Sequence, residues 1–199
     1  MEVRVQDYWY GFVRTFDEIE DVPQKNGKLW AYIYQTVSAA VAAIVILCVV
    51  FTFCFRFVGV LGDSMNPTLH EGDLLAVASL PAAKKNDIVI ITQPNTMEKP
   101  LVKRVIASGG DVVDIDALSG VVKVNDTVLE ESAYIAEQTA TTGDVQFPLT
   151  VPEGCFFVMG DNRNNSMDSR FSVIGCIDED YILGVVKFRA FPFSAIQIM

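Results

Sequence analysis

The chain has 199 residues, enough for one domain of ordinary size plus an appendage. Its net charge of −10 leaves no basic surface to displace the counterions of a nucleic acid, so we exclude nucleic-acid partners. With one histidine and no C-x-x-C among its four cysteines, the sequence predicts no zinc site, and we expect no metal or other cofactor.

Residues 1–28 precede a long apolar run and are interpreted as a short cytoplasmic N-terminal segment. Trp9, Phe12, Val13 and Phe16 recur in it at helical spacing. We favour a helix that lies on the membrane face or folds back on its own chain over a docking site for a partner.

A transmembrane helix is predicted over residues 29–56. The hydrophobic fraction of 51% and the mean hydropathy of +0.32 are high for a soluble protein, and residues 29–55 contain no charge. About 20 apolar residues suffice to cross a bilayer, whereas the apolar core of a cleaved signal peptide has only roughly 7–15. The run is apolar on all faces, which disfavours a buried core helix.

Basic residues near the two ends of this run predict its orientation. Lys25 and Lys28, with Arg14 further back, precede it, and Arg56 follows. The positive-inside rule then places the N-terminus in the cytoplasm and residues 57–199 outside the cell membrane, as a single-pass protein.

Residues 57–199 are predicted to form a mostly β extracytoplasmic domain. Short runs rich in Val and Ile, separated by Gly, Pro, Asn and Asp, predict strands at residues 73–79, 87–92, 101–107, 111–116, 120–125, 155–160 and 182–190. No amphipathic helices alternate with these runs, which disfavours a doubly wound α/β sheet. Cys155 and Cys176 lie where a disulfide is permitted, and their spacing leaves a bridge and free thiols equally open.

Ser64 lies in a turn that also contains His70, and it is a candidate nucleophile. The sequence "GDSMN" nearly matches G-x-S-x-G, but Asn66 replaces the second glycine, and Pro67 disfavours the strand-to-helix turn of a nucleophile elbow. A triad would have to use His70, in a turn leading into a strand, where an exposed histidine is the usual outcome. A lysine is therefore the other candidate for the general base.

A lysine acts as a base near neutral pH only if burial lowers its pKa from about 10.4. Lys84 and Lys85 lie in a solvated turn, and Lys123 lies on an exposed hairpin strand. Lys103 shares a strand face with apolar residues and is either extended toward water or held neutral for catalysis.

Residues 158–170, "VMGDNRNNSMDSR", run from a strand into a loop dense in Gly, Asp, Asn, Ser and Arg. One interpretation is a solvated surface loop. The other is a buried network of arginines and carboxylates that holds a site rigid, with the Ser166 hydroxyl orienting a neutral lysine.

Three segments together, "GDSMNPTL" with "GD" at 72–73, "KRVIASGGD" and "GDNRNNSMDSR", resemble the conserved boxes of type I bacterial signal peptidases. They occur in that family's order behind one membrane anchor, and the short β domain resembles the compact Gram-positive form. The resemblance covers roughly residues 55–192 and implies a signal-peptidase-like β fold.

The resemblance implies Ser64 as the nucleophile, Lys103 as the general base and a hydrogen bond from Ser166 to the lysine. It also implies structural supports at Asp161, Asp168, Arg170 and Arg104, the last as an ion-pair partner of Asp161. The backbone N–H of Ser64 would be one oxyanion donor. Where some members carry a serine, this chain has Gly62, so we expect a main-chain group there, or water, as the second donor.

The function implied is that of a membrane-anchored serine endopeptidase that removes signal peptides from secreted precursors. Its partners would be membrane-bound precursors and the lipid bilayer, at the bacterial cytoplasmic membrane. Ser64 follows Arg56 by eight residues, which places it within about 26 Å of the end of the predicted span. The alternatives are another Ser/Lys membrane peptidase, such as a pilin-maturing one, and a non-enzymatic membrane-anchored β module.

Overall fold

The computed structural model describes residues 27–79, 82–92 and 99–198, with the backbone alone at Val50, Phe51, Phe53 and Cys54. The helix expected around Trp9 and Phe16 lies outside the described residues. The chain divides into two units, residues 1–49 and 50–199, and each is described by itself.

Helix α2 spans Gly27–Cys54 and carries the predicted apolar run. Its stretch Gly27–Val49 is long and apolar enough to cross a membrane once, and its side chains are exposed along this length. The helix ends two residues before the predicted end at Arg56, because Phe55 and Arg56 pair with Ala78 and Val77 as the start of a strand.

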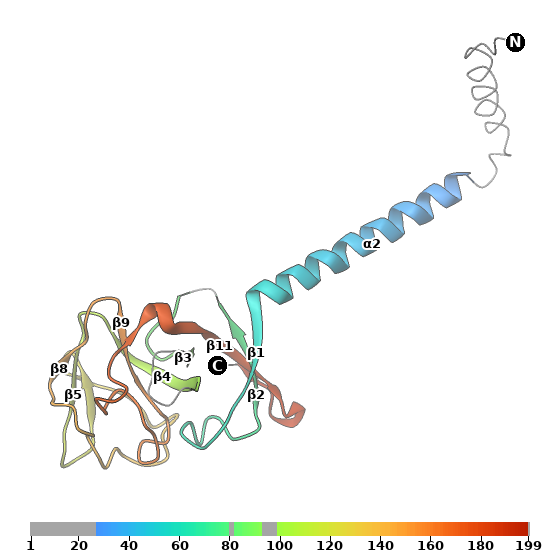
Figure 1. Cartoon of the computed structure of the whole chain (residues 1–199). Helices are drawn as coiled ribbons and strands as arrows, with labels where there is room; N and C mark the ends of the chain where they lie inside the picture. Colours follow the sequence, from blue (N-terminus) through green and yellow to red (C-terminus); the bar gives the residue numbers. More distant parts are fainter. Residues whose placement is uncertain (1–26, 80–81, 93–98, 199) are drawn as a thin grey trace, which may run out of the picture. The chain divides into compact units, whose positions relative to one another are not determined.

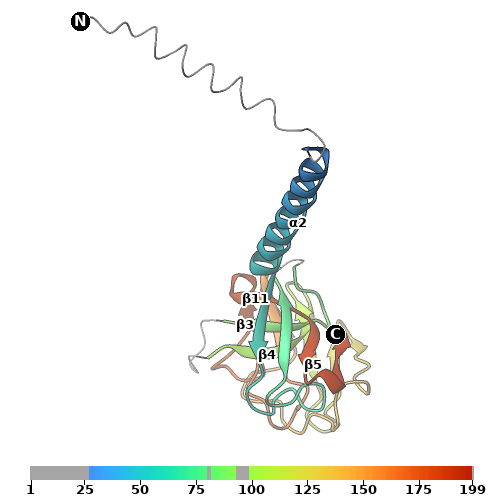
Figure 2. The same ribbon diagram turned by 90° about the vertical axis from the view of Figure 1, so that its right-hand side faces the viewer.

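The larger of two antiparallel sheets has eight strands in the order β1-β2-β11-β3-β4-β9-β10, with β12 paired to β11 (Figures 1 and 2). The strands are β1 (Phe55–Gly59), β2 (Leu74–Ala78), β3 (Ile88–Ile91), β4 (Leu101–Ser108), β9 (Cys155–Met159), β10 (Ile177–Asp178), β11 (Ile182–Phe191) and β12 (Gln197–Ile198). The late strand β11 therefore lies between the early strands β2 and β3.

The smaller sheet has the order β7-β6-β5-β8. It comprises β5 (Val112–Ile115), β6 (Val122–Val124), β7 (Thr127–Val128) and β8 (Leu149–Thr150), and β5 to β7 form a meander. Two short 3-10 helices, η2 (Glu179–Tyr181) and η3 (Phe193–Ala195), flank β11.

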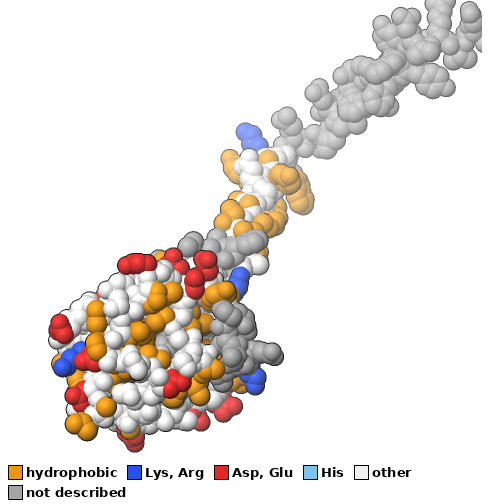
Figure 3. Space-filling model, turned by 60° about the vertical axis from the view of Figure 1, so that its left-hand side comes forward, with side chains coloured by type: hydrophobic (Ala, Val, Ile, Leu, Met, Phe, Trp, Pro, Cys, Tyr) orange, Lys and Arg blue, Asp and Glu red, His pale blue; other side chains and the backbone are white. Residues whose placement is uncertain are grey.

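The predicted mostly β fold behind one apolar helix is confirmed. Three clusters of buried Val, Ile, Leu, Met and Phe side chains form the core. Strand β3 is buried at every position, and β2 and β9 at all but their first, which explains why their sequences are continuous apolar runs rather than alternating ones. The face of the β domain in Figure 3 carries scattered acidic side chains among apolar and uncharged ones, in keeping with the acidic net charge.

Candidate active site

Ser64 lies in the loop of residues 60–73 that joins β1 to β2, called here the Ser64 loop. The loop is closed at its base, where Val60 N–H donates to the Asp73 carbonyl at 2.8 Å and Gly72 N–H donates to the Val60 carbonyl at 3.1 Å. Met65 and Leu69 are buried in the core and fix the inner side of the loop. The Ser64 loop is therefore a closed turn held at both ends and in the middle.

Lys103 projects from β4 onto Ser64. Its Nζ lies 2.8 Å from Ser64 Oγ, and the residue is only 3% exposed. Burial lowers the pKa of Lys103 from 10.5 to about 8. The negative charge of Asp168 raises this pKa, the positive charge of Arg170 lowers it, and the negative charge of Asp161 raises it. The structure thus brings the two predicted catalytic residues into contact and makes the neutral amine accessible near neutral pH.

The loop that follows β9 holds the backbone around Ser64. Asn162 N–H donates to the Ser64 carbonyl at 3.0 Å, and Asn162 Nδ2 donates to the Asp63 carbonyl at 3.0 Å. Gly160 permits this approach, since a Cβ there would lie 2.4 Å from the Ser64 carbonyl oxygen and 2.2 Å from Ser166 Oγ. Only glycine fits between the two loops.

The ion pair predicted between Arg104 and Asp161 is present and bidentate. Arg104 Nε and Nη2 donate to the two oxygens of Asp161 at 2.8 and 2.6 Å. Thr68 Oγ1 in the Ser64 loop donates to the same carboxylate at 2.5 Å. Neighbouring residues of β4 therefore serve different purposes: Lys103 contacts Ser64, and Arg104 anchors the loop that carries Ser64 through Asp161.

Asp168 and Arg170 form a second bidentate pair, and both side chains are fully buried. Asp168 also accepts the Gly160 N–H at 2.9 Å. The Arg170 guanidinium donates further to the carbonyls of Thr141 and Arg163 at 3.0 and 2.7 Å. The pair thus fixes the path of residues 160–170, which the sequence left open between a solvated loop and a buried network.

One expectation about the site turns out differently, and two neighbouring positions are explained by the structure. The predicted hydrogen bond from Ser166 to Lys103 is not formed: Ser166 Oγ is buried and has no hydrogen-bond partner among the described residues. His70 is exposed, and its hydrogen bond to Asp73 uses its backbone N–H rather than the imidazole. Gly62 adopts a φ of +78°, a conformation that disfavours side-chain-bearing residues, so the turn itself accounts for the glycine.

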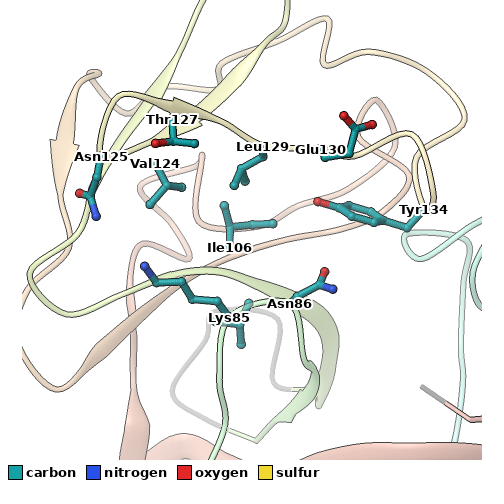
Figure 4. A pocket seen from close by; sticks show the side chains of 10 residues that line it. Lys85, Asn86, Ile106, Val124, Asn125, Thr127, Leu129, Glu130 and Tyr134 are labelled. Atoms are coloured by element: carbon teal, nitrogen blue, oxygen red, sulfur yellow. The ribbon is translucent and has the colours of Figure 1, made fainter.

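A second buried network escaped the sequence analysis. Arg163 is 2% exposed and donates through both terminal nitrogens to the Glu131 carboxylate and to Thr139 Oγ1. The Tyr134 ring covers Arg104, with its centroid 4.2 Å from Cζ. Tyr134 and Ile106 both line a cavity of about 420 Å³ between the two sheets, which neither Ser64 nor Lys103 lines (Figure 4). Glu131 lies 32 positions from Arg163 in a turn-rich segment, and no local pattern signals the pairing.

A cleft of about 370 Å³ opens beside Ser64 and Lys103. It is lined by two segments, Val58, Gly59, Val60, Leu61, Ser64 and Met65 from one side and Lys99, Pro100, Leu101, Val102 and Lys103 from the other. Strand β1 pairs with β2 alone, and β9 pairs with β4 only from Arg104 onward, so among the described residues both segments keep an unpaired strand edge. Such edges can accept an extended peptide.

The cysteines and potential metal ligands stand apart from this site. Cys155 and Cys176 are free thiols, and burial raises the pKa of each, that of Cys176 to about 11. Within the described part of the chain no cluster of His, Cys, Asp and Glu is suited to a metal ion.

A serine hydroxyl held against a buried lysine amine, beside a cleft with open strand edges, defines the class of protein as a hydrolase. The family model described as "Signal peptidase, peptidase S26" matches residues 33–191. The chain therefore belongs to the signal peptidase family, peptidase S26.

Two relatives from Bacillus species agree with this assignment. Signal peptidase I of Bacillus licheniformis is 38% identical over 175 residues, which cover 83% of this chain and 92% of that protein. Signal peptidase I T of Bacillus subtilis (strain 168) is 40% identical over 169 residues, covering 80% of this chain and 86% of that protein. A solved signal peptidase I from Enterococcus faecalis V583 has 28% identity and a TM-score of 0.43, and the match covers 54% of this chain and 98% of that one.

Proposed function

We propose that this protein removes signal peptides from secreted precursor proteins, with Ser64 as the nucleophile and Lys103 as the general base. The observation that carries the proposal is the 2.8 Å contact between Lys103 Nζ and Ser64 Oγ, made by a lysine that is 3% exposed. A charged lysine could only donate to Ser64, whereas a neutral one can accept its proton.

Acylation begins when the neutral Lys103 amine accepts the Ser64 hydroxyl proton as Oγ attacks the scissile carbonyl carbon. The resulting Lys103 ammonium then donates this proton to the leaving nitrogen, and the C–N bond breaks. The mature protein leaves with a free amino group, and the signal peptide remains as an ester on Ser64.

Deacylation reuses the same base. Lys103 accepts a proton from water as the water oxygen attacks the ester, and the proton passes to Ser64 Oγ as the acyl bond breaks. The Ser64 N–H donates to no acceptor among the described residues, which supports its assignment as one oxyanion donor. The second donor is assigned to the backbone at Gly62 or to water, and loss of one donor typically costs about 10²–10³ in rate.

The remaining predicted residues are assigned to support rather than to chemistry. Asp161 and Arg104 brace Thr68, and Asp168 and Arg170 brace Gly160. The Ser166 hydroxyl is assigned to Lys103 in the substrate-bound state, because its Oγ is buried without a partner and a buried hydroxyl is costly to leave unpaired.

The substrate is assigned to the cleft as an extended strand. An extended peptide can pair with the open edges at β1 and at Leu101–Lys103, and alternate side chains then point into the cleft. The mostly apolar lining suits the small residues expected at the first and third positions before the cut.

The enzyme is assigned to the bacterial cytoplasmic membrane, with residues 1–28 in the cytoplasm, α2 across the bilayer and residues 57–199 outside. The support is the apolar, exposed stretch Gly27–Val49 and the excess of basic residues, Lys25 and Lys28, on its N-terminal side. Membrane-bound precursors would then meet the active site on the side to which they are exported.

The test is incubation of the purified full-length chain with a precursor that carries an A-x-A site. We expect cleavage after this site by the wild type and a fall of at least about 10³-fold for Ser64→Ala and Lys103→Arg, since an arginine stays protonated. The exposed His70 serves as the control, and His70→Ala should retain its rate to within about twofold.

Three results would contradict the proposal. Cleavage by Ser64→Ala at the wild-type rate would remove Ser64 from the mechanism. A wild-type protein that is folded and inserted but cleaves no precursor would favour the non-enzymatic β module, and cleavage of pilin precursors alone would favour a pilin-maturing peptidase.

A further inference from the structure

Arg189 on β11 contacts the Ser64 loop at atoms other than the one that Asp161 binds. Its Nη1 donates to Asp73 Oδ2 at 2.9 Å and to the Thr68 carbonyl at 3.4 Å. Arg189 is 9% exposed and Asp73 is 4% exposed, so this is a buried ion pair rather than a surface one. Asp73 belongs to the "GD" at 72–73 of the first resembling segment, whereas Arg189 did not stand out in the sequence.

The same guanidinium also binds the end of the chain. Arg189 Nε donates to the Ala195 carbonyl at 2.8 Å, and Nη2 donates to Gln197 Oε1 at 3.3 Å. Strand β12 folds back on β11, with Gln197 opposite Arg189 and Ile198 opposite Phe188. The C-terminal segment, residues 192–198, thereby covers Arg189 and holds the guanidinium in place.

Arg189 acts on the two positions that control the Ser64 loop. Asp73 closes the base of the loop through its carbonyl, and its carboxylate also accepts the His70 N–H at 3.0 Å. Thr68 is bound on its hydroxyl side by Asp161 and on its carbonyl side by Arg189. Two guanidinium groups, those of Arg104 and Arg189, therefore fix the loop from two sides.

We propose that Arg189 is a positioning residue for Ser64, which joins the Ser64 loop to the C-terminal segment and so sets the distance between Ser64 and Lys103. The inference rests on the proposed function of the Ser64–Lys103 pair. Removal of the guanidinium leaves the buried Asp73 carboxylate without its cation, and the loop, which loses its anchor at Asp73 and at the Thr68 carbonyl, shifts. A displacement of about 1 Å at a reacting group can cost about 10²-fold in rate.

The experiment measures kcat and KM on the A-x-A precursor for the wild type, Arg189→Ala, Arg189→Lys and Ser64→Ala. For Arg189→Ala we expect kcat to fall by about 10²-fold while KM changes little, because the cleft that binds the peptide contains no part of Arg189. The kcat of Arg189→Lys should lie between those of the wild type and Arg189→Ala, since one ammonium cannot reproduce the planar guanidinium that reaches Asp73 and Ala195 together.

Addition of guanidinium ion to Arg189→Ala distinguishes a positioning role from a purely structural one. If Arg189 positions Ser64, the added ion should restore kcat, whereas a purely structural role predicts no change in kcat. A cavity of about 410 Å³ lined by Thr68, Arg189 and Gln197 gives a small cation access to the vacated position. At concentrations far below those that unfold proteins, guanidinium should restore a large part of kcat to Arg189→Ala, and sodium chloride of the same ionic strength should not. Lys103→Ala should show no rescue.

Lys187 on the same strand supplies the matched control, and Lys187→Ala should keep the wild-type kcat and KM. A wild-type kcat in Arg189→Ala, or a loss that guanidinium leaves unchanged, overturns the inference. If Arg189→Ala does not fold, as judged by its thermal transition in detergent, Arg189→Lys decides, and a wild-type kcat there overturns it. Ser64→Ala keeps the two proposals apart, because its full activity would contradict the proposed function itself.

Discussion

At the scale of the residue, Lys103 shows which of several opposed effects controls its charge. Asp168 and Asp161 both favour the ammonium form, and Arg170 favours the neutral amine. Each carboxylate is already paired in bidentate fashion, Asp168 with Arg170 and Asp161 with Arg104, so little of its field remains for the lysine. Burial therefore dominates, and the pKa falls.

The pH dependence of cleavage follows from this pKa. Because only the neutral amine accepts the Ser64 proton, kcat/KM should rise tenfold per pH unit below pH 8 and level off above it, with a midpoint at about 8. Initial rates on an A-x-A peptide between pH 5 and 10 measure the curve. A midpoint where histidine side chains ordinarily titrate, lost in His70→Ala, would assign the base to His70 instead.

Lys103 also imposes a cost on folding that depends on pH. Its folded pKa of about 8 lies below the unfolded value of 10.5, so the unfolded chain binds more protons in between, and stability rises as the pH increases from 8 to 10.5. Below pH 8 the full cost is on the order of 3 kcal/mol. Lys103→Met should therefore be inactive yet more stable than the wild type at pH 7, by roughly that amount.

Denaturant unfolding of the two proteins at a series of pH values measures this effect. The difference in unfolding free energy should shrink steadily above pH 8 and be small at pH 10.5. Lys123→Met, at a partly exposed position on β6, should show no such trend. Equal pH dependence in both variants would refute the assignment of the cost to Lys103.

At the scale of the element, the site depends on how closely β9 and its following loop approach the Ser64 loop. Gly160 directly follows β9, and a Cβ there would meet the Ser64 carbonyl oxygen at 2.4 Å. Gly184 in β11 is equally crowded, because a Cβ there would meet the Ala78 carbonyl oxygen at 2.5 Å, but its contact lies between β11 and β2. Alanine at either glycine should have a similar steric cost, but only alanine at Gly160 should disturb Ser64. A comparison of the two variants therefore separates loss of stability from loss of catalysis.

We expect Gly160→Ala and Gly184→Ala both to lower the unfolding free energy, by roughly 1–3 kcal/mol each as overpacked variants do. Only Gly160→Ala should also lower kcat in the fully folded protein, by about 10²-fold, because it displaces the Ser64 carbonyl and hence the nucleophile. Rates measured well below both melting temperatures test this, and a similar loss of kcat in Gly184→Ala would contradict it.

The strands that the sequence predicted are those with long apolar runs, such as β3 and β4, because a run of apolar residues indicates a buried strand. The first two residues of β1, Phe55 and Arg56, were assigned to the predicted helix, because no turn signal separates them from the apolar run. The two-residue strands β8, β10 and β12 have too few residues to form a pattern, and only their partners define them.

Some residues of the candidate site could be predicted from the sequence, and others could not. Ser64, Lys103 and the Arg104–Asp161 pair were expected from motif resemblance. The apolar neighbours of Lys103 alone left its side chain open between extension toward water and burial. Glu131, Thr68 and Arg189 were not expected, because each takes its role from a partner far away in the chain. Long-range pairing leaves no local signal in one sequence.

At the scale of the whole molecule, the β unit has its own cores and all the residues assigned to catalysis. A chain lacking residues 1–49 should therefore keep its thermal transition and cleave a soluble A-x-A peptide with a kcat close to that of the full chain. It should process membrane-inserted precursors much more slowly, since it no longer shares their bilayer. Parallel assays with peptide and with precursor in liposomes measure this, and loss of peptide cleavage would contradict it.

The position of β11 in the sheet has a consequence for the time at which the enzyme becomes active. The strands that carry the Ser64 loop, β1 and β2, are joined in the sheet to those that present Lys103, β3 and β4, only by β11, which spans Ile182–Phe191 near the end of the chain. A nascent polypeptide still on the ribosome already contains both side chains assigned to catalysis but lacks the strand that joins their two parts of the sheet. We therefore expect proteolytic activity to begin only once β11 has been made, when synthesis is almost finished.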